Sequence, residues 1–251
     1  MLAVISPAKT LDFKGPPPRV QPTSPRFEKE AEALAAGASR LSSAKLGALM
    51  HISPKLAELN AGRFRRFEEQ PARPALYAFA GDVYAGFEVH SLDEEAVSFA
   101  QHHLRILSGL YGLLRPLDQI RPYRLELGTR WAPGRKKDLY GFWGNRIADM
   151  LLSDLAAQGD EVVINLASRE YWRAVEGRLP NVHVVEIDFR EEGPDGLRFN
   201  TFAAKRARGM MARYICEHRL DDPEALKGFD SDGYAFDPDG SEPRRWRFRR
   251  S

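Results

Sequence analysis

The sequence predicts a mixed α/β fold in a single domain spanning residues 1–251, with a mixed sheet flanked by helices. Three observations support this prediction. Short apolar runs of strand length alternate with longer segments of helical periodicity, which is typical of α/β proteins. Late in the chain, two pairs of apolar runs are separated only by turns, which adds antiparallel strands to the sheet. No linker, repeat or low-complexity tract divides the chain, and its 43% hydrophobic residues suffice for one substantial core.

Four elements are predicted in the N-terminal part of the chain. They are a strand, two helices and a second strand, at residues 1–5, 24–36, 53–69 and 75–79. Both helices begin at a Ser-Pro pair, in which the serine can cap the helix and the proline occupies its first position. The proline-rich stretch before the first helix is interpreted as an extended loop.

The segment LSGLYGLLRPLDQIRPYRLELG (107–128) follows a predicted helix that starts at Ser91, has Glu94 at capping-box spacing and ends at Gly109. Gly109 and Gly112 then form a turn, and a second helical piece is expected in LLRPLDQI. Helix, glycine turn and helix is the layout of a helix-hairpin-helix, whose backbone N–H groups bind a phosphate. The usual pattern spaces its glycines two residues apart rather than three. A plain helix end followed by solvated arginines is therefore the alternative.

The C-terminal half continues the alternation of helices and strands. A helix, a strand, a helix, two strands, a helix and a hairpin are predicted at residues 138–159, 161–168, 168–175, 182–189, 197–202, 203–219 and 234–248. Gly159 ends the first of these helices, and Ser168 can cap the second. The turn EEGPDG between the two strands predicts that they pair as a hairpin.

Positive charge is concentrated in parts of the chain although the net charge is only +2. Residues 105–146 contain nine Lys and Arg against three acids, and residues 198–213 contain five cations and no acid. On the helix at 203–219, Lys205, Arg206 and Arg208 lie opposite an apolar arc that holds its two methionines. This basic arc is either solvated or the wall of a groove for an anion such as nucleic acid.

Polar residues also gather where predicted strands end. Lys9 and Asp12 follow the first strand, and Asn165 and Ser168 lie where VVINLAS turns into its helix. Loops at the carboxyl ends of strands are where α/β proteins place ligands. Together with Glu126, these residues form an acid/base and anion-binding set that indicates an enzyme acting on a nucleotide-like or phosphorylated ligand. The simpler interpretation is that the serines only cap helices.

Other function classes lack support in the sequence. The six histidines show no metal-binding spacing, and GxGxxG, GxxxxGK[ST] and GxSxG are absent, so neither a metal nor a cofactor is expected. Cys216 is the one cysteine, which excludes an internal disulfide. No leader-like segment or membrane-length apolar run is found, and we expect a cytoplasmic protein without a membrane partner. The oligomeric state is left open.

Seven motifs occur along the chain in a characteristic order: ISPAKTLDF, FAGDVYAG, LSGLYGLLRPLD, PYRLELG, LYGFWG, NLASREY and AKRARGMMARYI. In these motifs the chain resembles the YaaA peroxide-stress protein family over essentially its whole length. The resemblance implies a fold unlike the common superfolds, a positively charged cleft and a helix-hairpin-helix-like element. It also implies binding of duplex and distorted DNA, and a role in limiting iron-dependent oxidative damage, but it implies no catalytic reaction.

Two hypotheses follow, with different site residues. The favoured one is a stress protein that binds DNA by backbone and shape, through Lys9, Gly109, Gly112, Arg115, Arg121, Arg124, Asn165, Ser168, Lys205, Arg206 and Arg208. The alternative is an enzyme at the strand-end loops, with Lys9, Asp12 and Glu126 as candidate catalytic residues. A third hypothesis, direct iron sequestration, is the weakest because the sequence contains no cluster of metal ligands.

Overall fold

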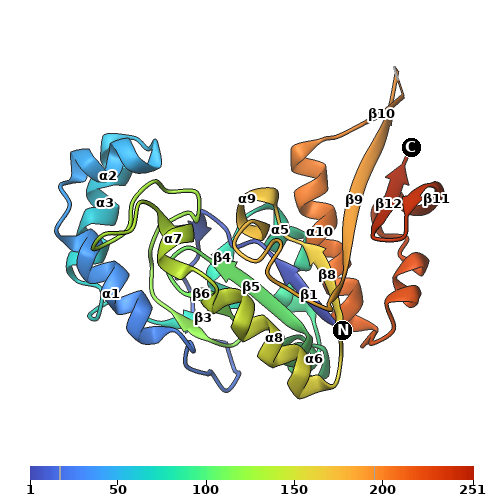
Figure 1. The fold of residues 1–251 in the computed structure, drawn as a ribbon, viewed down its shortest axis with the longest axis horizontal. Helices are drawn as coiled ribbons and strands as arrows, with labels where there is room; N and C mark the ends of the chain where they lie inside the picture. The colour runs from blue at the N-terminus through green and yellow to red at the C-terminus, as the bar shows by residue number, and fades with distance from the viewer. Residues whose placement is uncertain (17, 195) are drawn as a thin grey trace.

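The computed structural model describes residues 1–16, 18–194 and 196–251, and its centre is a mixed β-sheet (Figure 1). Seven strands follow the order β11-β12-β9-β8-β1-β5-β6, and an eighth, β10, pairs with β9. Their bounds are β1 (Leu2–Ile5), β5 (Leu104–Ser108), β6 (Gly112–Leu114), β8 (Val162–Leu166), β9 (His183–Gly193), β10 (Gly196–Arg198), β11 (Ala235–Glu242) and β12 (Arg245–Arg250).

The middle of this sheet is parallel and its margins are antiparallel. Strands β5, β1, β8, β9 and β12 run in one direction, whereas β6, β10 and β11 pair antiparallel with β5, β9 and β12. Strands β1 (LAVI) and β8 (VVINL) are nearly continuous apolar runs because both faces of the sheet are covered here. The predicted mixed α/β class is confirmed, as are the two late hairpins β9–β10 and β11–β12. The strand predicted at 197–202 ends at Arg198, however, and residues 201–202 belong to the next helix.

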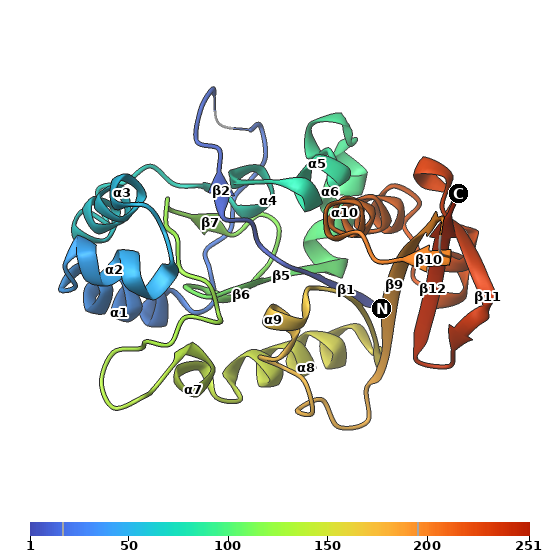
Figure 2. The ribbon, with the colours of Figure 1, turned by 90° about the horizontal axis from the view of Figure 1, so that it is seen from above.

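Helices lie on both sides of the sheet (Figure 2). One side carries α5 (Asp82–Phe87), α6 (Glu94–His103) and α10 (Thr201–Glu217), and the other carries α7 (Leu139–Trp143), α8 (Arg146–Gln158) and α9 (Arg169–Trp172). Helix α10 packs on α5 and on the sheet through small and apolar residues that include Ala207, Met211 and Ile215. Met211 is therefore a core residue, as its helical position predicts.

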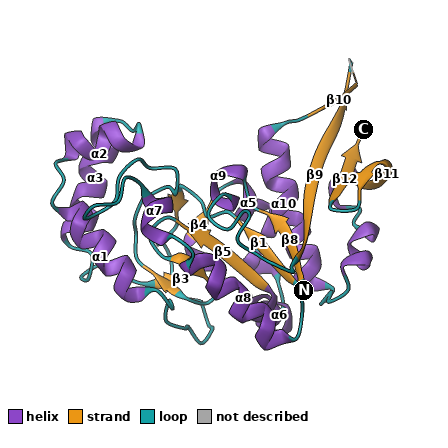
Figure 3. Ribbon diagram, in the orientation of Figure 1, coloured by secondary structure: helices purple, strands orange, loops and turns teal. Residues whose placement is uncertain are grey.

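A group of three helices, α1 (Glu28–Ser39), α2 (Ser43–Met50) and α3 (Pro54–Arg65), lies at the opposite end of the molecule from β11 and β12 (Figure 3). The Ser53 hydroxyl caps α3 by accepting from the N–H of Leu56 at 3.4 Å, as predicted. The remaining short elements are β2 (Thr10–Leu11), β3 (Arg73–Pro74), α4 (Ala75–Ala78), β4 (Phe79–Ala80), β7 (Gln119–Ile120) and the 3₁₀ segments η1 (Val89–Ser91), η2 (Pro223–Gly228) and η3 (Ser231–Gly233).

The predicted elements at residues 75–79 and 138–159 differ from those in the structure. Residues 75–79 form a helical turn, α4, before entering β4 at Phe79, instead of a strand. The predicted helix at 138–159 is two helices, because Gly144 adopts φ +55° between α7 and α8. Gly159 ends α8 in the left-handed region, as predicted. In both errors, a run of apolar residues was too short or too uniform for its periodicity to identify the element.

The helix-hairpin-helix predicted around Gly109 and Gly112 is wrong. Helix α6 ends at His103, and the following LRILS is the buried strand β5 rather than a helical continuation. The two glycines lie in the tight turn between β5 and β6, where Ser108 pairs with Gly112 in antiparallel register. The N-cap of α6 is Asp93, whose carboxylate accepts from a backbone N–H, and not Ser91 of the predicted capping box.

Burial gives both glycines a packing role instead of an anion-binding one. A Cβ on Gly109 would lie 2.1 Å from the carbonyl oxygen of Leu125, and one on Gly112 would lie 2.8 Å from the ring of Trp143. The Trp143 indole also donates to the carbonyl of Gly109 at 3.0 Å. The glycines are therefore needed because other backbone and ring atoms come too close for any side chain.

Candidate functional site

A cleft of about 680 Å³ opens beside the loops that follow β1 and β8. Its charged lining residues are Lys9, Glu126, Arg130 and Glu170, and the C-terminal end of α2, including His51, forms another wall. Because β1 and β8 are neighbouring parallel strands, their carboxyl ends meet at the same edge of the sheet, where α/β proteins place ligands.

Hydrogen bonds fix the two strand-end loops to each other. The Ser6 hydroxyl accepts from the N–H of Ser168 at 2.8 Å, and the Tyr84 hydroxyl donates to the carbonyl of Ser6 at 3.1 Å. The Asn165 side chain accepts from the N–H of Ala167 at 3.0 Å. Asn165 and Ser168 thus shape the backbone of the loop, and the Ser168 side chain makes no capping bond to α9.

Glu126 is the centre of charge in the cleft. Its Oε1 lies 3.0 Å from Nε of Arg124 and 3.6 Å from Nζ of Lys9. The Glu126 side chain is 11% exposed, whereas that of Lys9 is 64% exposed, so Lys9 presents its ammonium to the solvent. Oε2 of Glu126 is buried and has no hydrogen-bond partner within the described part of the chain. The carboxylate therefore has one oxygen held by cations and one oxygen enclosed without a partner among the described residues.

A buried wall of tyrosines supports this carboxylate and its arginine. Tyr123, next to Arg124, shares a hydrogen bond of 2.7 Å with the Ser108 hydroxyl, which also accepts from the N–H of Tyr111 at 3.0 Å. Burial raises the pKa of both Tyr111 and Tyr123, so their hydroxyls stay neutral and serve as hydrogen-bonding groups. This wall fixes the backbone from which Arg124 and Glu126 project.

A second carboxylate, Glu170, reaches the cleft from α9. Its Oε1 accepts from the N–H of Gly128 at 3.0 Å, and its own carbonyl accepts from the Tyr140 hydroxyl at 2.7 Å. The loop that carries Glu126 and Arg130 is thereby attached to α9. Neither Glu170 nor Arg130 was among the candidate site residues, and the sequence offered only the proximity of Glu170 to Ser168 as a signal.

The end of α2 and the start of α3 form a helical hairpin beside the cleft. Helix α2 ends at His51, which adopts φ +51°, and α3 begins after the Ser53 cap. A Cβ on Gly47 would lie 3.3 Å from Cβ of Ala57, so the two helices pack closely. Helix α2 was missed from the sequence, although Ser42 provides an N-cap by accepting from the N–H of Lys45. Two helices joined by a tight turn thus occur here rather than at the glycine pair.

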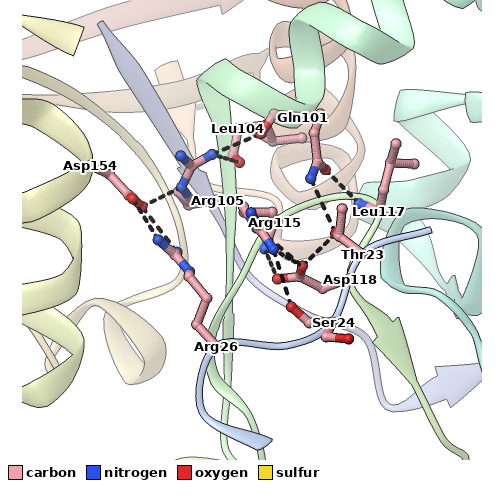
Figure 4. Close-up of polar contacts among 10 residues, drawn as sticks. All are labelled: Thr23, Ser24, Arg26, Gln101, Leu104, Arg105, Arg115, Leu117, Asp118 and Asp154. Atoms are coloured by element: carbon pink, nitrogen blue, oxygen red, sulfur yellow. Dashed lines mark hydrogen bonds and ion pairs between the residues drawn. The ribbon is translucent and has the colours of Figure 1, made fainter. Parts of the chain in front are cut away.

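Arg115, a predicted anion-binding residue, is already bonded inside the molecule, as are Arg26 and Arg105 (Figure 4). Arg115 donates to Oδ1 of the buried Asp118 at 2.8 Å and to the carbonyl of Ser24 at 3.1 Å. Arg26 and Arg105 both bind Asp154, at 3.0 Å and 2.6 Å. These guanidinium groups hold separate chain segments together, and this role accounts for part of the positive charge that the sequence concentrates at 105–146.

The other predicted residues do not line the cleft. Arg121 donates to the carbonyl of Gln70, and the carboxylate of Asp12 accepts from the N–H of Lys14 within its own loop. Arg208 is largely buried, and burial lowers its pKa against the opposing influence of Asp188. Lys205 and Arg206 are exposed on α10. Of the candidate residues, the structure therefore brings Lys9, Arg124 and Glu126 together.

The described residues contain neither a metal-binding cluster nor a membrane-spanning helix. Within 1–16, 18–194 and 196–251, no group of three or more His, Cys, Asp or Glu side chains is arranged to hold a metal ion. None of the helices in these ranges has the length and apolar character required to cross a membrane.

Comparison with known proteins gives matches over nearly the whole chain. A family model described as peroxide stress protein YaaA matches residues 1–240. A UPF0246 protein from Rhizorhabdus wittichii is 61% identical over 249 residues, which cover 99% of this chain and 98% of that protein.

Proposed function

The chain belongs to the peroxide stress protein YaaA family, and from this premise we propose that it acts under peroxide stress by binding the phosphate backbone of DNA at the cleft. One observation carries the proposal: exposed cations from distant segments, Lys9 and Arg130, lie on one cleft beside the α2–α3 hairpin. Three more exposed cations, Arg135, Lys136 and Lys137, follow Arg130 along the same loop.

The charges around the cleft favour contacts with a phosphate backbone over contacts that distinguish the bases. The carboxylate of Glu126 is paired with Arg124. The exposed charged residues of the cleft are Lys9, Arg130 and Glu170, and the carboxylate of Glu170 accepts from the N–H of Gly128. Exposed lysines and arginines contact phosphates without distinguishing bases, and each contact releases counterions. We therefore expect sequence-tolerant binding that weakens steeply as salt is added.

A salt titration of binding to a fluorescent duplex tests the proposal. Lys9→Ala and Arg130→Ala should each weaken binding and reduce the slope of log affinity against log salt by about one unit. Lys29→Ala is the matched control, because Lys29 is an exposed cation on α1 that does not line the cleft. A parent protein whose affinity does not change with salt, or equal effects of all three substitutions, would refute backbone binding at this cleft.

A second candidate function is a reaction on a nucleotide-like or phosphorylated ligand in the same cleft. The observation in its favour is the unpartnered Oε2 of the buried Glu126, next to the ammonium of Lys9. In this arrangement Lys9 would hold an anionic group and Glu126 would accept a proton from the ligand. An acid in this position contributes nothing to phosphate binding, since it repels the phosphate.

Glu126→Gln separates the two functions because it keeps the shape of the side chain and removes its charge. If the protein acts only by binding DNA, the variant should bind duplex at least as tightly as the parent and protect cells from peroxide equally well. If Glu126 is a catalytic base, protection should be lost while duplex binding is retained. Thermal unfolding of the purified variant serves as the check that the fold is intact.

A further inference from the structure

Exposed apolar side chains are concentrated in one short segment. Five large hydrophobic residues are exposed among the described residues, and three of them are Leu197, Phe199 and Phe202, at 38%, 49% and 72%. The other two, Leu56 and Leu59, lie on α3. Single exposed apolar residues are ordinary on a protein surface, but a local cluster with a largely exposed phenylalanine indicates a binding surface.

This segment lies where the β9–β10 hairpin, which projects from the body of the molecule, leads into α10 (Figure 1). Asn200 fixes it in place. Its Oδ1 accepts from the N–H groups of Phe202 and Ala203 at 3.1 and 3.3 Å, and its Nδ2 donates to Glu191 on β9 at 2.8 Å. Phe199 and Phe202 are thus held on either side of a rigid helix cap, with Cα atoms within about 11 Å of each other. We call these two residues the Phe199–Phe202 platform.

Cations accompany both rings of the platform. The guanidinium of Arg190 lies 5.5 Å from the ring centre of Phe199, and the ammonium of Lys205 lies 5.8 Å from that of Phe202. Arg206 is one helical turn from Phe202 and is exposed. Within the described ranges, neither Lys205 nor Arg206 pairs with a carboxylate.

The nearest acids cancel the charge of Arg190 but not that of Lys205 and Arg206. Both carboxylate oxygens of the buried Asp188 accept from Nε of Arg190 at 3.0 Å. Glu191 is bound by Arg250 and Asn200, and Arg250 holds the pKa of Glu191 below its ordinary value. Glu192 lies 3.9 Å from Arg249. The platform therefore presents exposed aromatic rings within a positively charged surrounding.

Exposed aromatic faces flanked by cations match the chemistry of single-stranded nucleic acid. Unpaired bases stack on such rings while lysine and arginine contact the adjacent phosphates, and every base has a face that can stack. In a duplex the base faces are already occupied by neighbouring bases, so it gains nothing from the rings. A purely apolar protein partner would gain nothing from the cations.

We propose that the Phe199–Phe202 platform binds unpaired bases of single-stranded nucleic acid, with Lys205 and Arg206 contacting its phosphates. The inference rests on the proposed DNA-binding function and adds a second surface to it. The cleft binds the backbone of a duplex, and the platform selects DNA in which bases are unpaired.

The experiment compares binding of a fluorescent oligothymidylate and of a duplex of equal length at one salt concentration. Phe202→Ala should weaken binding of the single strand about tenfold, and the double variant with Phe199→Ala should weaken it further, because each stacked base contributes separately to the affinity. Duplex binding should stay within about twofold of the parent, since the duplex bases are already stacked. Phe202→Trp should retain single-strand binding, and Leu59→Ala, at an exposed apolar residue of α3, should have no effect.

The possible outcomes separate the platform from the cleft. A parent that binds duplex but not the single strand, or a double variant that binds the single strand like the parent, would overturn the platform and leave the proposed function standing. Single-strand binding that depends on Phe202 without any duplex binding would support the platform and overturn the proposed function. Sedimentation showing that the parent self-associates and that Phe202→Ala dissociates it, with single-strand binding unchanged, would make the platform a contact between copies of the chain.

Discussion

Gly112 shows how one residue combines a backbone requirement with a packing requirement. It adopts φ +67°, and a Cβ at this position would lie 2.8 and 2.9 Å from two ring carbons of Trp143 and 3.1 Å from Phe27. Both aromatic side chains are buried, and their ring centres are 5.3 Å apart. Neither ring can move without displacing its neighbours in a close-packed core.

We predict that Gly112→Ala lowers the free energy of unfolding by about 2–4 kcal/mol, since left-handed strain and overpacking add. Urea unfolding of the variant measures the loss. Gly134→Ala is the control, because Gly134 has φ +73° and no atom within 4 Å of a Cβ. Gly134→Ala should lower the free energy of unfolding by about 1–2 kcal/mol, the effect of backbone strain alone. Equal losses in the two variants would mean that the Trp143 contact has no energetic weight.

The arginines show why it is hard to decide from the sequence whether a single residue has a structural or a functional role. Arg115 and Arg124 look alike among the cations of residues 107–128, but Arg115 is bonded to a buried aspartate while Arg124 borders the cleft through Glu126. Asp118 lies only three residues from Arg115, yet the sequence contains no sign of its burial. Whether a cation is structural or functional therefore depends on the burial of its partner, which only the folded chain determines.

At the level of elements, the contact between α5 and α10 depends on one glycine in each helix. A Cβ on Gly209 of α10 would lie 1.8 Å from the carbonyl oxygen of Val83, and one on Gly86 of α5 would lie 2.1 Å from the carbonyl oxygen of Arg206. The backbones of the two helices thus touch at their crossing. This contact places α10 on the sheet and so sets the position of its exposed cations.

We predict that Gly209→Ala destabilises the fold by about 2–4 kcal/mol, because backbone overlap outweighs the better helix propensity of alanine. Gly62→Ala in α3 should do the opposite. Gly62 has no atom within 4 Å of a Cβ, so alanine there should stabilise by about 0.5–1 kcal/mol. Thermal unfolding of both variants checks the two signs, and a stable Gly209→Ala protein would rule out direct backbone contact between α5 and α10.

Elements with local signals were predicted from the sequence, and elements defined by their surroundings were not. Strand β1, the Ser53 cap of α3 and the Gly159 end of α8 follow from nearby residues. The strand β5 was mistaken for the end of a helix because Leu104 and Leu107 continue the helical spacing of the residues before them. Burial of the whole strand leaves no alternation of apolar and polar residues to mark it. Helix α2 was missed because it has only eight residues, too few for a clear helical periodicity.

At the scale of the whole molecule, the sequence predicted only those residues of the candidate site that belong to local motifs. Lys9 and Glu126 belong to recognisable motifs, and the structure places them 3.6 Å apart. Glu170, Arg130 and the end of α2 join them through tertiary contacts between segments far apart in the chain. The spacing of residues in the sequence does not predict these contacts, because they depend on how the loops after β1 and β8 pack against each other.

Ion pairs between distant segments hold these parts together. Asp154 on α8 binds Arg105 on β5 and Arg26 in the segment before α1, as Figure 4 shows. Asp160 similarly binds the amino group of Met1 at the start of β1. Asp154 connects α8 to the central strands, and Asp160 connects the loop after α8 to them. The charge state of these two aspartates therefore affects the stability of the whole fold.

Acid should unfold the protein through these aspartates. Burial by itself raises the pKa of Asp154, but hydrogen bonds from Arg26 and Arg105 outweigh it and hold that pKa below its ordinary value. A carboxyl group with a depressed folded pKa contributes stability that is complete above its unfolded pKa, about 3.9, and is lost as the pH falls through the folded pKa. We therefore predict that the Tm of the parent falls as the pH drops below about 4.

Asp154→Asn should have a Tm several degrees lower at neutral pH and a shallower fall in acid, because the group that binds the extra proton on unfolding is gone. Asp149→Asn is the matched control, since Asp149 is an exposed carboxylate on the same helix. It should keep the acid profile of the parent, with Tm followed by circular dichroism from pH 7 downward. If Asp154→Asn keeps the parent's full acid sensitivity, the fold does not depend on the Arg26–Asp154–Arg105 contact, and other carboxylates must account for the loss of stability.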